Sequence, residues 1–226
     1  MLQSDAPPAI VSPWTASPRP WDQRYWFAQH RAFVARARRG GIDVIFLGDS
    51  IVELFPIAGR DVWERRIAPL GTVVDFGIGG DRTQFVLWRV QHGELENSGA
   101  RVVVLMIGTN NLDTAPPQSI ARGVAAVVGA IRAKLPNAVV VLNALLPRGR
   151  SDDPARAQLA AVNARIAALA DGKHVRWLDA GAGFVDASGT IAPALMPDLL
   201  HPSARGYERY ATALRPVLLE TLAKGR

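Results

Sequence analysis

The sequence predicts an α/β protein in which a five-stranded parallel sheet carries helices on both faces. From residue 43 onward, short apolar runs alternate with longer segments of helical period, and the runs are too continuous for strands with one wet face. The chain has 226 residues, of which 49% are hydrophobic, enough to build one substantial core. No internal repeat or linker interrupts the alternation, so one domain is expected over residues 22–226.

Residues 1–21 are rich in proline and are expected to form an irregular N-terminal arm. A first helix is expected over Asp22–Arg39, where aromatic and aliphatic residues recur at helical spacing, and its cationic last turn ends at Gly40 and Gly41. The aromatic-rich part, Trp21 to Phe33, either covers the sheet edge or forms an interface. Core burial is the commoner fate of such a stripe, so we favour the covering helix.

The expected strands share short, continuous apolar character; they are Val44–Leu47, Val73–Phe76, Val102–Ile107, Ala138–Leu142 and Val175–Leu178. The clearest later helices have one apolar face each and are Gln118–Leu135, Pro154–Ala170 and about Ser203–Leu222. Asp153 followed by Pro154 is a typical helix start, since Asp accepts capping bonds and Pro is preset for the first turn. Pro216 is expected to kink or interrupt the last helix.

Composition excludes several classes of site. There are no cysteines, which rules out disulfides, thiolate metal sites and a cysteine nucleophile. The net charge is +6 and the pI near 10.4, but the basic residues are dispersed, so no nucleic-acid partner is expected. Of the 26 basic residues 23 are Arg and 3 are Lys, which suggests the GC-rich genome of a bacterium.

The sequence leaves the compartment open. No apolar run approaches the roughly 18 to 20 residues of a membrane span, so no integral membrane segment is expected. Residues 1–11 lack the basic and apolar segments of a signal peptide. The chain is therefore expected to be a soluble protein, either of the cytoplasm or exported after removal of a leader that this sequence does not contain.

Polar motifs follow three of the predicted strands. Ser50 follows the first strand, Gly80 the second and Asn110 the third, while Asp198 and His201 lie in the loop before the last helix. Ligands of open α/β sheets bind outside the carboxyl ends of the strands. We therefore expect these residues to share one edge of the sheet.

Together these residues meet the needs of a serine hydrolase. Ser50 is the candidate nucleophile, His201 the base and Asp198 the group that holds the imidazole. Of the four histidines only His201 has a carboxylate three residues before it in a loop flanked by prolines, Pro197 and Pro202. His30 is expected on a core-facing helix surface, and His92 and His174 on the solvated surface. Neither G-D-S nor D-x-x-H alone is specific for a serine hydrolase. The order of the motifs and their placement at strand ends are what make the combination specific.

The candidate oxyanion donors are the backbone N–H groups of Ser50 and Gly80 and the side-chain amide of Asn110. The neighbouring Asp49 and Asn111 are expected to hold their loops by hydrogen bonds. A metal site at the Asp-His pair lacks a convincing third ligand, so no metal is expected.

These blocks carry a family resemblance. The chain resembles the SGNH (GDSL) hydrolases in Gly48-Asp49-Ser50, Gly79-Gly80-Asp81, Gly108-Thr109-Asn110 and Asp198 to His201. Further stretches resemble the catalytic α subunits of intracellular platelet-activating-factor acetylhydrolase; they are residues 75–81, 86–89, 93–96 and 145–149. The similarity extends from about residue 26 to residue 219.

The resemblance implies a flavodoxin-like, three-layer α/β/α fold and a cofactor-free esterase with the triad and oxyanion hole named above. It implies a preference for short acyl groups, with an acyl pocket closed by Ile51, Thr109 and Leu200. It also suggests a homodimer. The loops at residues 112–117 and 193–197 depart from the relatives, so neither a phosphoglyceride leaving group nor a WD-repeat partner is carried over.

The expected activity is hydrolysis of a short-chain, most readily acetyl, ester of a small molecule through an acyl-Ser50 intermediate. Alternatives on the same machinery are deacetylation of carbohydrates, thioester hydrolysis and lysophospholipid hydrolysis. The alternative outside enzymes is a binding module that keeps the fold but has no catalytic activity. A nucleotide site at Gly77-Ile78-Gly79 is disfavoured because Arg82 stands where the G-x-G-x-x-G pattern needs glycine.

Overall fold

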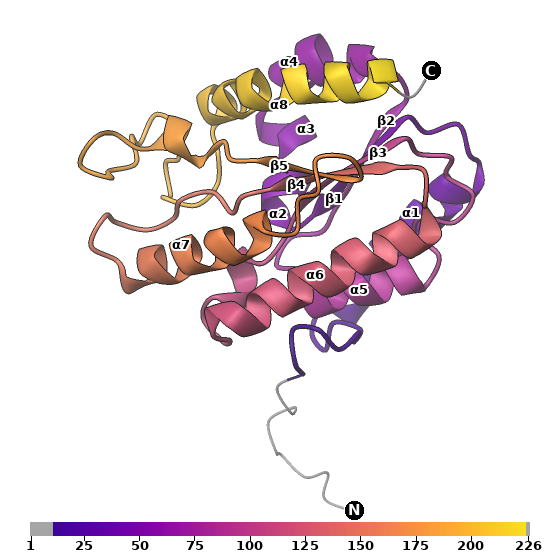
Figure 1. Cartoon of the computed structure of the whole chain (residues 1–226), viewed down its shortest axis with the longest axis horizontal. Helices are drawn as coiled ribbons and strands as arrows, with labels where there is room; N and C mark the ends of the chain where they lie inside the picture. The colour runs from indigo at the N-terminus through magenta and orange to yellow at the C-terminus, as the bar shows by residue number, and fades with distance from the viewer. Residues whose placement is uncertain (1–10, 225–226) are drawn as a thin grey trace, which may run out of the picture.

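The computed structural model describes residues 11–224, which fold around a five-stranded parallel sheet (Figure 1). The strands are β1 (Val44–Gly48), β2 (Val73–Gly77), β3 (Val102–Met106), β4 (Val139–Asn143) and β5 (Val175–Leu178). Their spatial order is β2-β1-β3-β4-β5, and every pair is parallel. This is the flavodoxin-like order, in which the chain reverses direction across the sheet between β1 and β3.

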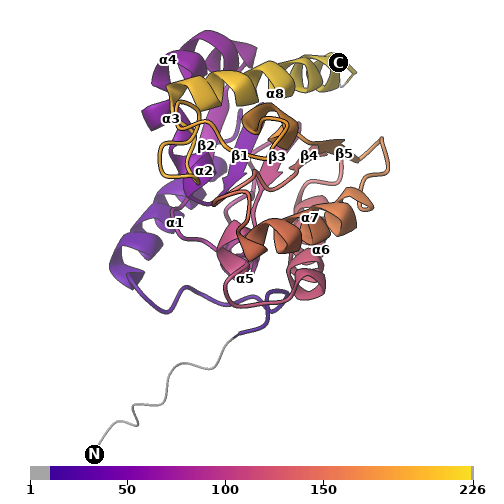
Figure 2. The same ribbon diagram turned by 90° about the vertical axis from the view of Figure 1, so that its left-hand side faces the viewer.

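Helices cover both faces of the sheet (Figure 2). One face carries α1 (Gln23–Arg38), α5 (Thr83–Gln91), α6 (Pro117–Lys134) and α7 (Pro154–Ala167). The other carries α8 (Ala204–Lys224) and the short helices α2 (Ser50–Glu53), α3 (Phe55–Ala58) and α4 (Arg60–Val62). The fold is thus a three-layer α/β/α sandwich, as expected.

Alternate residues of each strand enter the two halves of the core. In β1, Ile45 and Leu47 pack with the α1, α5 and α6 layer, while Val44 and Phe46 pack with the α8 layer. All five residues of β1 are buried, which explains their unbroken apolar run. Because β1 is an interior strand, between β2 and β3, its carboxyl end and Ser50 just after it lie between the loops that follow these two strands.

The five strands and the four long helices predicted from the sequence are confirmed, with ends that differ by three residues at most. Asp153 accepts the Ala155 N–H at 2.8 Å and caps α7 as expected. Of the two outcomes expected at Pro216, a kink or an interruption, the interruption is wrong: α8 runs through this residue. Buried Leu214 and Leu218 on either side of it hold the helix on the sheet, and this tertiary packing outweighs the hydrogen bond that proline cannot make.

Two helical parts of the chain were not predicted from the sequence. Residues 50–70 form the short helices α2, α3 and α4, followed by a π-helical turn (Trp63–Ile67) and a 3-10 turn (Ala68–Leu70). The nine-residue helix α5 was also unassigned, because all but two of its residues are buried and it shows little amphipathic contrast. Within the N-terminal arm, residues 11–21 form no helix or strand, and residues 1–10 lie outside the described part of the chain.

No helix within residues 11–224 combines the length and the hydropathy that a membrane span needs.

Candidate active site

Ser50 is the first residue of α2, directly beyond the carboxyl end of β1. The buried Asp49 carboxylate accepts the N–H of Ile51 at 3.0 Å and so holds the turn, as predicted. From α8, the hydroxyl of Tyr207 donates to the Ile51 carbonyl at 2.8 Å. Gly77 allows α2 to approach β2, because a Cβ at this position would lie 2.2 Å from the Glu53 nitrogen. Strand, turn and helix therefore fix the direction of the Ser50 side chain.

The loop that bears His201 is built around Asp198. One carboxylate oxygen, Oδ1, accepts the N–H groups of Leu200 at 3.0 Å and His201 at 2.7 Å. Leu199 takes a left-handed conformation with φ 59°, which bends the chain back on itself. The Leu199 carbonyl accepts the N–H of Gly149 at 2.8 Å, which ties this loop to the one after β4.

Ser50, His201 and Asp198 form a continuous hydrogen-bonded chain. Oγ of Ser50 lies 2.9 Å from Nε2 of His201. On the other side of the imidazole, Nδ1 lies 2.6 Å from the second carboxylate oxygen of Asp198, Oδ2. The side chain of Asp198 is 55% exposed and that of His201 29%. The hydrogen-bonded series is therefore in contact with solvent at its Asp198 end.

The Asp198 carboxyl is held in its ionised form. Partial burial by itself would raise its pKa, but the hydrogen bonds from the His201 ring and from two backbone N–H groups bring the pKa below the ordinary value for Asp. An ionised carboxylate at Nδ1 fixes the imidazole tautomer that leaves Nε2 free to accept a proton from Ser50.

Gly80 and Asn110 lie on the loops that follow β2 and β3. Gly80 has φ 78°, a conformation that favours glycine. A Cβ on the preceding Gly79 would lie 3.7 Å from Cβ of Ser50, which places this loop against the serine. The Asn110 amide donates to the Asp81 carbonyl at 2.9 Å and so joins the two loops, and its second N–H remains for another acceptor.

Asn111 holds the β3 loop, as predicted. Its side-chain oxygen accepts the N–H of Thr83 at 3.0 Å, and its amide donates to Gln84 at 3.0 Å. The residue is fully buried. The two adjacent asparagines therefore differ: Asn111 turns into the protein, while Asn110 is half-buried at the edge of the sheet.

A buried ion cluster lies beneath the site. The Arg89 guanidinium bonds to the carboxylates of Asp81 at 2.9 Å and Glu94 at 2.8 Å. It also donates to the carbonyls of Phe76 at 2.9 Å and Gly48 at 3.1 Å, the ends of β2 and β1. Burial raises the pKa of Asp81 to about 6, against the opposing effect of Arg89. Asp81, Arg89 and Glu94 lie in the stretches that carry the family resemblance, but no role could be predicted for them from the sequence.

Two further connections were also missed in the sequence. Arg148 donates to the Thr109 carbonyl at 3.1 Å, while its neighbour Gly149 bonds to Leu199 as described. The loop after β4 therefore braces both the Asn110 loop and the His201 loop. The other connection, from Arg19 of the N-terminal arm to Gly79, is 2.6 Å long.

The three residues expected to close an acyl pocket flank the site in sequence and differ in exposure. Ile51 and Thr109 are buried, next to Ser50 and Asn110, and Leu200 is half-buried, next to His201. The histidines outside the site lie elsewhere: His30 is buried as expected, His92 is exposed and stacks on Trp88, and His174 is half-buried. Among residues 11–224 no three His, Asp or Glu side chains gather in a way that fits a metal ion.

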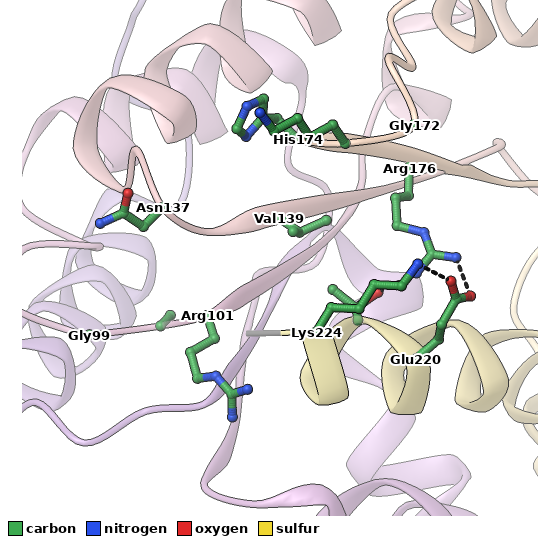
Figure 3. Close-up of a pocket in the computed structure, with 12 residues that line it drawn as sticks. Gly99, Arg101, Asn137, Val139, Gly172, His174, Arg176, Glu220 and Lys224 are labelled. Carbon is green, nitrogen blue, oxygen red and sulfur yellow. Dashed lines mark hydrogen bonds and ion pairs between the residues drawn. The ribbon is translucent and has the colours of Figure 1, made fainter. Parts of the chain in front are cut away.

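A pocket of about 600 Å³ lies at the opposite edge of the sheet (Figure 3). Arg101, Val139 and Arg176 line it at the amino ends of β3, β4 and β5. Glu220 of α8 binds both Arg176 and Lys224, at 2.6 Å each, and Arg101 bonds to the Leu222 carbonyl. Two of the cations that line the pocket are thus paired with Glu220, and the pocket is separate from Ser50.

Comparison with known proteins decides the family. Residues 46–209 match the GDSL-like lipase/acylhydrolase family, a span that includes every residue of the hydrogen-bonded chain. The chain belongs to this family. As a GDSL acylhydrolase it is a carboxylic ester hydrolase.

Curated relatives cover nearly the whole chain. It is 40% identical to human platelet-activating factor acetylhydrolase IB subunit alpha1 over 200 residues, 88% of this chain and 85% of that protein. It is 36% identical to the bovine subunit alpha2 over 223 residues, 98% of this chain and 95% of that protein.

Solved structures of the family share the fold. A GDSL-like lipase from Bacteroides thetaiotaomicron superposes with a TM-score of 0.70 at 19% identity, over 86% of this chain and 98% of that one. A carbohydrate esterase family 3 enzyme from Talaromyces cellulolyticus gives 0.63 at 21% identity, over 81% and 99%. At 19% and 21% identity these similarities show the fold alone.

Proposed function

We propose that this family member is a serine esterase that hydrolyses short-chain esters, acetyl esters above all, through an acyl-Ser50 intermediate. The observation that carries the proposal is the chain of two hydrogen bonds from Ser50 through His201 to Asp198, 2.9 Å and 2.6 Å long. Its donors and acceptors have the order that a serine nucleophile, a general base and an orienting carboxylate require.

In the first half-reaction Oγ of Ser50 attacks the ester carbonyl while its proton passes to Nε2 of His201. The resulting imidazolium is stabilised by the ionised Asp198. When the tetrahedral intermediate collapses, the alcohol leaves with the proton from His201, and the acyl group stays on Ser50. Water then attacks the acyl-enzyme by the same route, gives its proton to His201 and releases the acid.

The charge on the tetrahedral oxygen needs donors that are already in place. We assign this role to the backbone N–H groups of Ser50 and Gly80 and to the Asn110 amide. In support, the Gly79-Gly80 loop lies against Ser50, and Asn110 is tied to that loop through the Asp81 carbonyl. One N–H of the Asn110 amide is used in that bond, and the other is assigned to the oxyanion.

The short-acyl preference rests on Ile51, Thr109 and Leu200, which we assign to the walls of the acyl pocket. Two of them, Ile51 and Thr109, are buried, and buried side chains are held in place by their close-packed neighbours. The mammalian relatives at 36% to 40% identity are named acetylhydrolases, in agreement with a pocket that admits acetyl.

The chain organisation and the oligomeric state are part of the same proposal. We take residues 22–226 as one hydrolase domain and residues 1–21 as a proline-rich N-terminal arm. We also propose a homodimer, since the relatives are named as subunits. Light scattering of the purified protein tests the dimer: a monomer mass at assay concentration would contradict it.

Initial rates on p-nitrophenyl esters from acetyl to octanoyl test the activity, with wild type and Ser50→Ala side by side. We expect a wild-type rate that falls steeply beyond propionyl, and a loss in Ser50→Ala of several orders of magnitude with an unchanged melting temperature. A maximum at longer chains would overturn the acyl preference alone. A Ser50→Ala rate near that of the wild type would overturn the whole proposal.

A further inference from the structure

The N-terminal arm reaches the peptide unit that contains the Gly80 N–H. Nη1 of Arg19 donates to the carbonyl oxygen of Gly79 at 2.6 Å. This carbonyl and the Gly80 N–H belong to the same amide group. The side chain of Arg19 is only 7% exposed, so its charge acts on this peptide from a largely desolvated position.

A cation bound to an amide carbonyl changes the other end of the amide. It draws electron density toward the oxygen, and the N–H of the same group becomes a stronger donor. Charge-assisted bonds of this kind are stronger than neutral ones, and low local dielectric increases the effect. Arg19 therefore polarises the Gly79–Gly80 amide in the sense that favours binding of a negative charge by the Gly80 N–H.

The same glycine is held on its other side by an anion. The N–H of Gly79 donates to Oε2 of Glu53 at 2.8 Å, and Oε1 of Glu53 accepts the hydroxyl of Tyr25 at 2.8 Å. A Cβ on Gly79 would lie 2.7 Å from Oε2 of Glu53, so glycine lets this carboxylate approach in its present position. Arg19 and Glu53 together fix both polar groups of Gly79, and with them the plane of the next amide.

We propose that Arg19 is a positioning residue of the oxyanion hole, which both orients and polarises the Gly79–Gly80 amide. This inference rests on the proposed role of the Gly80 N–H. It gives the proline-rich arm a part in catalysis that is distinct from covering the core.

The arm has other attachments that do not touch this amide. The Pro13 carbonyl accepts the Thr83 hydroxyl at 2.8 Å, and the Ser17 N–H donates to Gln84 at 3.2 Å. The guanidinium of Arg122, on α6, lies 4.3 Å from the centre of the Trp14 ring. Arg122 therefore serves as a matched control: it is an arginine in contact with the arm, away from Gly79.

The experiment compares Arg19→Gln, Arg19→Lys and Arg122→Gln on p-nitrophenyl acetate. Arg19→Gln removes the charge and, because the Gln side chain is shorter, also the bond to the Gly79 carbonyl. We expect its kcat to fall by about tenfold to a hundredfold with KM within about twofold, since an oxyanion donor acts in the transition state. Arg19→Lys should recover part of the loss, and Arg122→Gln should keep the wild-type kcat.

A second readout separates positioning from stability. In enzyme inactivated by a p-nitrophenyl alkylphosphonate, a phosphonyl oxygen stands in for the oxyanion, and NMR follows the Gly80 amide proton. We expect this proton to move upfield in Arg19→Gln and to stay in place in Arg122→Gln.

Three outcomes would overturn the inference: a wild-type kcat in Arg19→Gln, an equal loss in Arg122→Gln, or an unshifted Gly80 proton. Ser50→Ala in the same assay distinguishes the two levels. Should Ser50→Ala remain active, the proposed function fails; should only the Arg19 variants behave as wild type, this inference alone fails.

Discussion

Oγ of Ser50 and Nε2 of His201 lie 2.9 Å apart although 151 positions separate them in the chain. The parallel sheet brings them together: Ser50 follows the interior strand β1, and the His201 loop returns to the same edge of the sheet before α8. The serine is fixed by backbone contacts of α2, whereas the imidazole is fixed by Asp198, which also shapes its own loop.

The adjacent asparagines give a matched pair of variants. Asn110→Ala removes the proposed oxyanion donor from a half-buried position, and we expect kcat to fall by about a hundredfold to a thousandfold with little change in stability. Asn111→Ala leaves the buried Thr83 N–H without its acceptor, and we expect a loss of about 1–3 kcal/mol in unfolding free energy. Rates and urea unfolding of both proteins test this. Equal stability losses in the two would contradict the division of roles.

We expect the buried Arg89 cluster to contribute more to the unfolding free energy than an exposed ion pair does. Arg89→Met removes the guanidinium from the buried carboxylates of Asp81 and Glu94, and one donor from each of two strand-end carbonyls, so we expect a loss of about 3–5 kcal/mol. Arg65→Ala is the control: it removes an arginine that is 63% exposed and paired with Glu208, and should change stability by less than about 1 kcal/mol. Urea unfolding measures both, and similar effects would refute the cluster's importance.

Leu200 is the acyl-pocket residue that is easiest to test, because it is only half-buried and its removal should leave the fold intact. We expect Leu200→Ala to raise the rate on butanoyl and hexanoyl esters relative to acetyl by about tenfold, the effect of one or two methylene groups in an apolar pocket. Leu219→Ala, an exposed residue on α8, should leave the profile unchanged. An identical chain-length profile in Leu200→Ala would remove this residue from the pocket.

Asp49 makes stability depend on pH. Burial raises the pKa of its carboxyl to about 7, against the opposing effect of the Ile51 N–H bond. A carboxyl group whose pKa is higher in the folded than in the unfolded chain binds more protons when folded. Its contribution to unfolding free energy therefore falls as pH rises from about 4, the unfolded pKa, to about 7.

The corresponding test is urea unfolding of Asp49→Asn at about pH 5 and about pH 8, on either side of most of that titration. The amide keeps an oxygen for the Ile51 N–H but cannot ionise, so we expect this variant to lose less stability over the interval than the wild type. Asp152→Asn, at an exposed carboxyl whose pKa the Arg150 hydrogen bond lowers, should follow the wild type. If all three proteins share one pH dependence, the Asp49 account is wrong.

The sheet could be predicted from the sequence because its strands are buried on both faces and each forms an unbroken apolar run. The placement of Ser50, Gly80 and Asn110 at one edge could be predicted because each follows the carboxyl end of a parallel strand. The helices α2, α3 and α4 within residues 50–70 could not be predicted because they are three or four residues long, too short to show a helical period. The continuity of α8 through Pro216 could not be predicted from local propensity, because it depends on the packing of Leu214 and Leu218.

The connections around the site were hidden for a different reason. Arg19 acts on Gly79 across 60 positions and Arg148 on Thr109 across 39, through single side-chain bonds to backbone carbonyls. Such bonds leave no pattern in one sequence, since the acceptor is a group that every residue has. The Asp198 loop could be anticipated only in part: the D-x-x-H spacing suggested the Nδ1 contact, but the left-handed Leu199 that permits it carries no signal.

Titration with a p-nitrophenyl alkylphosphonate, which reacts with an activated serine, tests the central claim most directly. Esterase activity and the position of the label are followed together, in wild type and in His201→Ala. The account predicts that activity falls to zero as one equivalent of phosphonate binds, with the label on Ser50, and that His201→Ala is labelled at least about a hundredfold more slowly. Activity that persists after Ser50 is fully labelled, or inactivation with the label on another residue, would contradict it.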